Sequence, residues 1–269
     1  MRLADAAIVL GVALAGGSIL MAAGGMLAGA AIAMLSTVVW FQWRYPWLKL
    51  GLGHASRASV REMLSPSLHY VGYTLGNLVS IQGSTIVIGA VLGPVAVALT
   101  STLRTLTRTG VTVANMLSIT LQIEYASLYG QSAFARFKHL LRWHATAIGA
   151  LVIAYLMLML ALGPQVYDIW THGKFGAPTV LLAWLTVATA CDIAWTALQT
   201  PSIAVNRMRI TGRTFFLVSC LGLAALGLLS REFGVIVFGW VSLAISLSMI
   251  LAATLETRIL TRSLNSPDA

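Results

Sequence analysis

Long apolar runs separated by short polar connections dominate the chain. We interpret them as eight membrane-spanning segments, because most are close to the ~20 residues that cross a bilayer core. The segments are residues 5–23, 24–42, 68–90, 94–122, 142–162, 178–200, 211–229 and 234–256. The first two belong to one charge-free run, which as a single helix would be about 54 Å long. We therefore expect a tight turn near Gly24 and Gly25 to divide that run into a hairpin.

Two connections have a spacing that predicts short helices at the membrane surface. In residues 131–143, phenylalanine and leucine recur at intervals of three and four among basic residues, which is typical of a helix in the headgroup region. Residues 58–66 show a weaker pattern, ended by Pro66. Topological anchoring explains both, and a lipid-headgroup sensor is the alternative.

Composition supports an integral membrane protein. Hydrophobic residues make up 58% of the 269 positions and charged residues only 9%, whereas soluble domains average about 25% charged residues. Little of the chain is left for a domain outside the bilayer. The predicted fold class is therefore all-α, a polytopic transmembrane helix bundle with about eight spanning helices.

The net charge of +9 is concentrated in alternate connections. Arginine and lysine follow the second, fourth, sixth and eighth segments, and the intervening turns are poor in base. The positive-inside rule then places both termini and the basic loops in the cytoplasm. No basic domain with interleaved aromatic residues lies outside the membrane, so we expect no nucleic-acid partner.

Residues that could support enzyme chemistry are scattered. Cys191 and Cys220 lie alone in separate apolar runs, without metal-ligand spacing. His139 and His144 are both expected at the membrane interface. We find no catalytic triad, phosphate-binding glycine loop or paired acids, and we expect no enzyme activity, no cofactor and no metal.

Two arginines stand inside the fourth segment. Arg104 is about 14 Å along a helix that enters at Val95, and Arg108 is about 6 Å further along the same face. A central arginine costs at least ~2.5 kcal/mol in a bilayer, so each should face a wet cavity or a buried acid. Asp192 is the best candidate acid. Two readings stay open: a cavity for an anionic ligand, or a purely structural network.

Other polar residues occur in the third predicted segment. Asn77 and Gln82 could hydrogen-bond a ligand or tie helices together. Gly76, Gly83 and Gly89 on the same segment would permit close packing or bending.

A family resemblance is visible at these residues. "GNLVSIQGSTIVIGAVLGPVAVALTSTLRTLTR" (76–108) resembles the seventh and eighth helices of the O-antigen and polysaccharide flippases, which belong to the multidrug/oligosaccharidyl-lipid/polysaccharide (MOP) exporter superfamily. "IWTHGKF" (169–175) and "AVNRM" (204–208) resemble later marks of that family in the same order. The similarity covers roughly residues 66–260. "IEYA" (123–126) departs from the family's Pro-Glu-aromatic-Ser, because only the glutamate and the aromatic residue are kept.

The resemblance implies one part of a two-lobed carrier. Residues 1–43 would be a transmembrane hairpin of the first lobe, and residues 44–66 a basic cytoplasmic connection. Residues 67–257 would be the six-helix second lobe, and 258–269 a cytoplasmic tail. Four helices of the first lobe would be absent, so a separate N-terminal half or a homodimer would complete the cavity.

The resemblance also implies a function. The substrate would be an oligosaccharide linked to undecaprenyl pyrophosphate, flipped across the bacterial inner membrane for lipopolysaccharide, O-antigen or exopolysaccharide assembly. Arg104 and Arg108 would contact the pyrophosphate, since guanidinium groups match phosphate oxygens. Asn77 and Gln82 would add hydrogen bonds, and Asp192 would pair with an arginine and release it in a coupling step. An inactive truncated relic and a small-solute or multidrug exporter are the alternatives.

Overall fold

The computed structural model describes residues 7, 9–12, 14, 16–47, 56–173 and 178–264. Every element among them is helical, and six helices are long and apolar enough to cross a membrane by length and composition. This confirms an all-α, multi-pass class of structure. Parts of the first predicted segment, of the 44–66 connection, of the "IWTHGKF" mark and of the tail lie outside the described residues.

Residues 1–60 and 61–269 form two compact units, and each is described by itself. The first unit contains α2 (Ile19–Arg44), whose N-cap Ser18 accepts a hydrogen bond from the Met21 amide. The predicted turn at Gly24 and Gly25 is wrong, because α2 continues through both residues. A chain in lipid loses backbone hydrogen bonds by turning there, and a glycine inside a helix costs less. The chain instead leaves helical conformation near Gly16, which has a φ of +69°.

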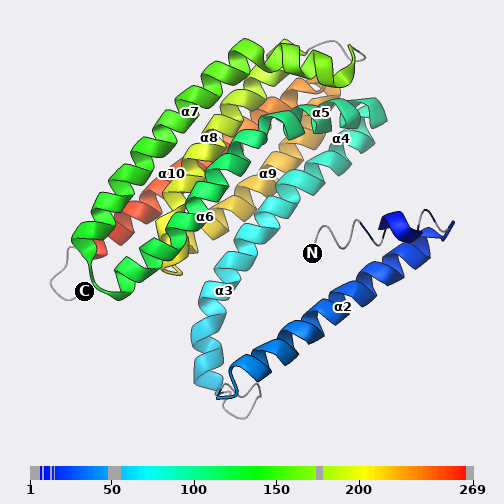
Figure 1. Ribbon diagram of the computed structural model, residues 1–269. Coiled ribbons are helices and arrows are strands. Elements are labelled where there is room, and N and C mark those ends of the chain that lie inside the picture. Colours follow the sequence, from blue (N-terminus) through cyan, green and yellow to red (C-terminus); the bar gives the residue numbers. More distant parts are fainter. Residues whose placement is uncertain are drawn as a thin grey trace. The chain divides into compact units, whose positions relative to one another are not determined.

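The second unit is a helix bundle (Figure 1). Its elements are α3 (Arg57–Leu78), the π-helix η1 (Val79–Gly83), α4 (Ser84–Leu92), α5 (Pro94–Thr107), α6 (Thr109–Gly130), α7 (Phe134–Thr171), α8 (Thr179–Ala204), α9 (Arg209–Phe233) and α10 (Ile236–Ser263). Helix α8 packs against α5, α6, α7 and α10, while α9 packs against η1, α4 and α10. The centre of the bundle is therefore α8, and α8 has the most buried residues.

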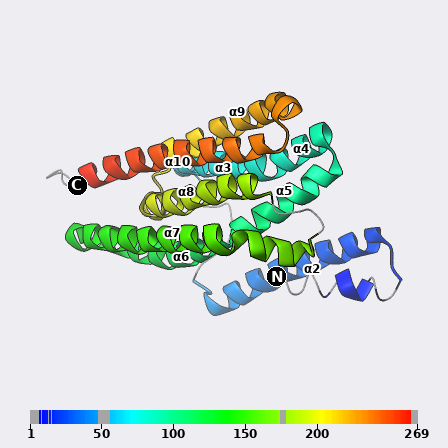
Figure 2. The same cartoon turned by 90° about the horizontal axis from the view of Figure 1, so that it is seen from above.

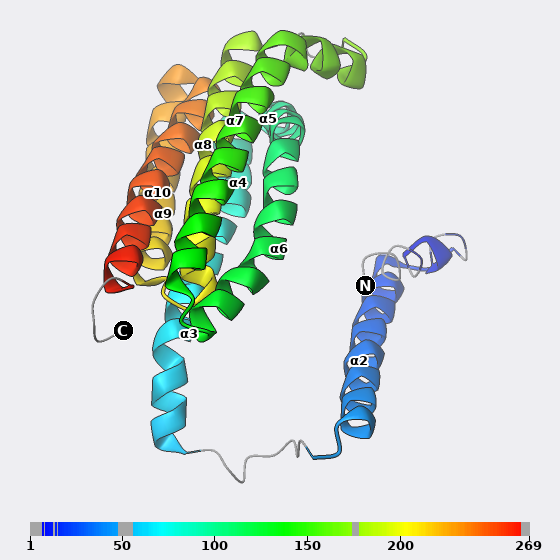
Figure 3. The ribbon, with the colours of Figure 1, turned by 60° about the vertical axis from the view of Figure 1, so that its left-hand side comes forward.

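Neither predicted surface helix is a separate element. Helix α7 begins at Phe134 and continues for 38 residues, and it bends over in the C-terminal part that contains Pro164 (Figure 3). Phe137 is fully buried against Tyr125 rather than facing lipid. Likewise, residues 58–66 belong to α3, which continues past Pro66. The amphipathic spacing was real, but in residues 131–143 its apolar side faces other helices.

The fourth predicted segment is two helices rather than one. Helices α5 and α6 meet at Arg108. Figures 2 and 3 show that the axis of α5 makes a steep angle with the axis of α6. The Tyr155 hydroxyl donates to the Thr107 carbonyl at this junction, at 3.0 Å. The depth of Arg104 and Arg108 in a membrane cannot be counted along one straight helix, because the helix axis changes direction at Arg108.

Glycines allow α3 and α9 to approach closely. A Cβ atom on Gly76 would lie 2.8 Å from the Phe215 backbone, and one on Gly212 would clash with the His69 carbonyl oxygen. Added Cβ atoms on Gly83 and Gly89 would lie 3.1 and 3.2 Å from Leu223 and Val97. The predicted close packing at Gly76, Gly83 and Gly89 is confirmed, and it holds α3, η1 and α4 next to the cavity.

Candidate functional site

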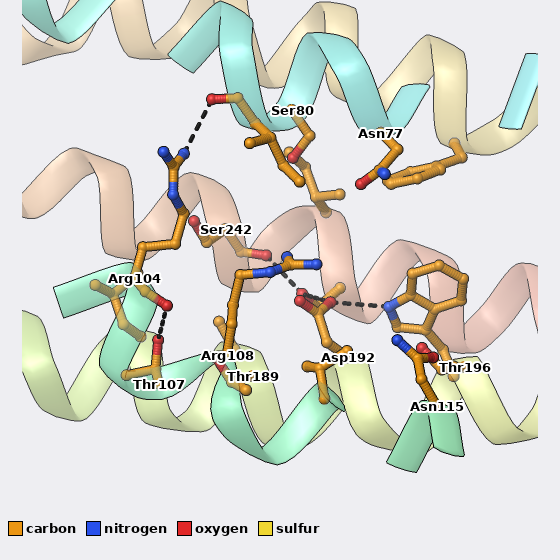
Figure 4. Close-up of a pocket in the computed structure, with 18 of the residues that line it drawn as sticks. Asn77, Ser80, Arg104, Thr107, Arg108, Asn115, Thr189, Asp192, Thr196 and Ser242 are labelled. Carbon is orange, nitrogen blue, oxygen red and sulfur yellow. Dashed lines mark hydrogen bonds between the residues drawn. The ribbon is translucent and has the colours of Figure 1, made fainter. Parts of the chain in front are cut away.

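A cavity of about 150 Å³ lies inside the second unit, among α3, η1, α5, α6, α8, α9 and α10. Four of the five predicted site residues line it: Asn77, Arg104, Arg108 and Asp192. Its ionisable arginine and aspartate side chains give two positive charges and one negative charge, a net +1. Polar side chains from α3, η1, α5, α6, α8 and α10 converge here (Figure 4), so the cavity is a polar compartment in an apolar bundle.

The Arg104 side chain is bound to the protein itself. Its guanidinium donates to the Ile81 carbonyl at 2.9 Å, to the Thr85 hydroxyl at 2.9 Å and to the Ser84 hydroxyl at 3.3 Å. The same group lies 6.0 Å from the ring centroid of Phe238, within cation–π range. Arg104 therefore ties α5 to η1 and α4, and most of its donors are already used.

The π-helix explains why these acceptors are present. Widened turns displace backbone carbonyls from the regular ladder and are frequent at functional sites. The Ile81 carbonyl belongs to η1, and it accepts from Arg104 and from the Thr85 hydroxyl at 2.9 Å. Arg104 and η1 thus stabilise each other.

The Arg108 side chain is different, although it is only one turn away. Among the described residues its guanidinium forms no hydrogen bond or ion pair, yet it lines the cavity. Figure 4 shows it extending beside Asp192. A guanidinium with unused N–H donors in a polar cavity can bind an anion through two parallel hydrogen bonds.

Asp192 is fixed through one of its two oxygens. Its Oδ1 accepts from Trp195 Nε1 at 2.8 Å and from the Ser246 hydroxyl at 2.7 Å. Within the described part of the chain, Oδ2 accepts no hydrogen bond. The carboxylate is therefore held in place while one oxygen stays available to Arg108, to a proton or to a ligand.

Several residues that line the cavity were not predicted from the sequence. Asn115, Thr189, Thr196 and Ser242 also line the cavity. Thr189, Asp192 and Thr196 follow a spacing of three and four along α8, so they share one helix face. That polar stripe within an apolar segment was a usable signal, and it would have extended the site from Asp192 to its neighbours.

An aromatic cluster forms part of the cavity wall. The ring centroids of Tyr73, Trp195 and Phe215 lie 5.5 to 6.2 Å apart. Trp195 and Phe215 are buried, and Trp195 also donates to Asp192. The cluster packs α3, α8 and α9 together beside the carboxylate.

Other predicted residues lie elsewhere. Gln82 is exposed on η1 and does not line the cavity. His139 is exposed, whereas His144 is buried between helices and lies 3.3 Å from the Tyr125 hydroxyl and 3.5 Å from the Ser118 hydroxyl. Hydroxyls on α6 satisfy both ring nitrogens. No metal-binding group of three or more side chains exists among the described residues.

Comparison of the chain with protein-family models, with curated proteins and with solved structures found no match. The resemblance to polysaccharide flippases therefore depends on the sequence motifs alone.

Proposed function

We propose that the protein binds a lipid-linked anion in this cavity and takes part in moving it across the membrane. The expected substrate is an oligosaccharide linked to undecaprenyl pyrophosphate, used for surface polysaccharide assembly. The observation that carries the proposal is the Arg108 guanidinium, which lines a polar cavity among spanning helices without a hydrogen-bond partner in the described chain.

The physical reason is the cost of moving a phosphate through hydrocarbon. A charged group at the bilayer centre is expensive unless water or an opposite charge accompanies it. Arg108 supplies the opposite charge, and Asn77 of α3 and Asn115 of α6 supply amide groups to the same cavity. Arg104 helps through its charge, but its position is set by η1 and α4.

Asp192 then has a role as a replaceable counter-ion. In the absence of ligand its carboxylate balances Arg108, and an arriving phosphate competes for the same guanidinium. Protonation of Asp192 would remove this competition, which is how the site could couple anion binding to a proton.

One observation favours a second candidate, an exporter of organic cations. A carboxylate beside Tyr73, Trp195 and Phe215 combines the acid and aromatic groups that recognise cations. The net positive charge of the lining side chains opposes it, so we place this candidate second. An inactive protein is the third outcome to be tested.

The test is ligand binding by the purified full chain, followed by native mass spectrometry. The probes are undecaprenyl pyrophosphate, uncharged undecaprenol and the cation tetraphenylphosphonium. We expect the pyrophosphate to bind at least about tenfold more tightly than the alcohol, and Arg108→Gln to remove the preference. Arg231→Gln, an exposed arginine at the far end of α9, is the matched control and should keep it.

Three results would contradict the proposal. Equal binding of pyrophosphate and alcohol would exclude headgroup recognition, and preferential binding of the cation would favour the exporter. Failure of a folded protein to bind any probe would favour an inactive protein.

A further inference from the structure

A second pocket lies at the end of the bundle where α8 ends and α9 begins. It has a volume of about 560 Å³ and is bordered by His69 of α3, by the Asn206–Ile210 connection and by the last turns of α10. The spans Thr179–Ala204, Arg209–Phe233 and Ile236–Ser263 all reach this end. The pocket is therefore at the level where a bilayer's hydrocarbon core gives way to its headgroups.

The polar side of the pocket carries unused positive charge. Arg209 is exposed and forms no hydrogen bond or ion pair within the described residues. Arg207 is also exposed and donates to the Ser263 hydroxyl at 2.9 Å, which leaves its other N–H groups available. Both side chains can reach a phosphate at the membrane surface.

The acid in the pocket does not neutralise these arginines. The two carboxylate oxygens of Glu256 accept from the Ile210 amide at 2.9 Å and from the Thr211 amide at 3.1 Å, and the Thr211 hydroxyl donates to the second oxygen. Glu256 is thus bound at the N-terminus of α9, where a helix favours negative charge. Its oxygens are occupied, while Arg207 and Arg209 are left for an external anion.

The other side of the pocket is apolar. Met208, Ile259 and Leu260 line it, and Ile259 is 56% exposed while Met208 and Leu260 are buried. A soluble anion would gain nothing from this wall. A phospholipid would use both sides, because its phosphate and its acyl chains are joined through glycerol.

We propose that this pocket binds an anionic phospholipid, with the phosphate at Arg207 and Arg209 and the glycerol and upper acyl chain against Met208, Ile259 and Leu260. Positive charge at the membrane surface attracts anionic lipid by roughly fivefold in affinity per basic residue. Two arginines therefore predict a preference of roughly 30-fold over a zwitterionic lipid with the same acyl chains. The inference does not depend on the proposed transport function.

The test is a lipid titration of the delipidated full chain by native mass spectrometry. Palmitoyl-oleoyl phosphatidylglycerol is compared with palmitoyl-oleoyl phosphatidylcholine on four proteins: wild type, Arg207→Gln/Arg209→Gln, Arg231→Gln and Arg108→Gln. We expect the preference for phosphatidylglycerol in all except the double variant, in which the two lipids should bind equally. Retention by Arg108→Gln would separate this pocket from the central cavity.

Two further measurements test the apolar wall of the pocket. Glycerol 3-phosphate should not displace the lipid, because it lacks acyl chains. Ile259→Trp changes an exposed side chain in the apolar wall and should weaken both lipids while the arginines stay in place. An undiminished preference in the double variant, an equal loss in Arg231→Gln, or displacement by glycerol 3-phosphate would overturn the proposal.

Discussion

Arg104 and Arg108 carry the same charge, but their surroundings give them different roles. Arg104 has three acceptors on η1 and α4, whereas Arg108 has none among the described residues. The helix ends between them, at Thr107, so regular helical geometry does not continue past this turn. A structural network and a cavity for an anion both agree with the sequence. The geometry fits the first to Arg104 and the second to Arg108.

A pair of matched substitutions should separate these roles. Arg104→Met removes three charge-assisted contacts and should lower the free energy of unfolding by about 1–3 kcal/mol. Arg108→Met removes a charge without hydrogen-bond acceptors in the described chain. Asp192 can take up a proton in this variant, so the free energy of unfolding should fall by less than about 1 kcal/mol. Unfolding of both variants in mixed micelles of increasing SDS content measures the difference. Equal destabilisation by the two changes would contradict the assignment.

Asp192 offers a second test at this scale. Asp192→Asn keeps an Oδ1 acceptor for Trp195 and Ser246 but removes the negative charge that competes for Arg108. We expect undecaprenyl pyrophosphate to bind about fivefold more tightly, for a change of ~1 kcal/mol. Titration of the variant against wild type gives the ratio. A large loss of affinity would show that the carboxylate helps to hold the ligand.

At the scale of elements, close contact between α3 and α9 positions one wall of the cavity. A Cβ on Gly212 would clash with the carbonyl oxygen of His69, a backbone atom that cannot move alone. No atom of another helix lies within 4 Å of a Cβ added to Gly149 on α7. A side chain at position 212 would therefore push α3 away from α9, whereas a side chain at position 149 would meet no other helix.

Alanine substitution at both glycines should show this difference. Gly212→Ala should destabilise the protein by more than ~2 kcal/mol, because the helices must separate. Gly149→Ala should be neutral or stabilise it by up to ~1 kcal/mol through higher helix propensity. Unfolding measurements on the two variants decide. A tolerated Gly212→Ala would mean that α3 and α9 are not held this closely.

The sequence predicted where most helices lie, but it did not predict which of their apolar faces pack against other helices. Apolar length correctly indicated helices over most of the chain, since a spanning helix satisfies its own backbone. The pattern in residues 131–143 could not show that Phe137 packs on Tyr125, because lipid and protein interiors are both apolar. The only local signal of the break at Arg108 is Gly110, and that glycine is equally explained by its close contact with Tyr155. The π-helix η1 is stabilised by Arg104 of α5, which the local sequence of η1 does not show.

At the scale of the whole molecule, the order of helices in the second unit places connections alternately at two ends. Gln131 and Arg262 lie at one end, near the contacts among Tyr125, Leu128 and Leu260, while Glu232 lies at the other. The positive-inside rule predicts that the first end is cytoplasmic.

Among site residues, the sequence predicted the two arginines and Asp192 because intramembrane charge is rare. It could not separate Gln82 from Asn77, since the wide turn of η1 alters which faces they occupy.

Cysteine labelling tests this orientation. In a background lacking Cys191 and Cys220, Glu232→Cys should react with an impermeant thiol reagent in intact cells. Gln131→Cys and Arg262→Cys should react only after the membrane is opened. All three positions are exposed, so burial does not explain protection. The reverse pattern would invert the expected topology.

The most direct measurement is an experimental structure of the protein with undecaprenyl pyrophosphate bound. We expect phosphate oxygens within hydrogen-bond distance of the Arg108 guanidinium, with Arg104 still donating to Ile81 and Thr85. A pyrophosphate that binds outside the cavity, or one that takes Arg104 from η1 and leaves Arg108 unoccupied, would contradict it.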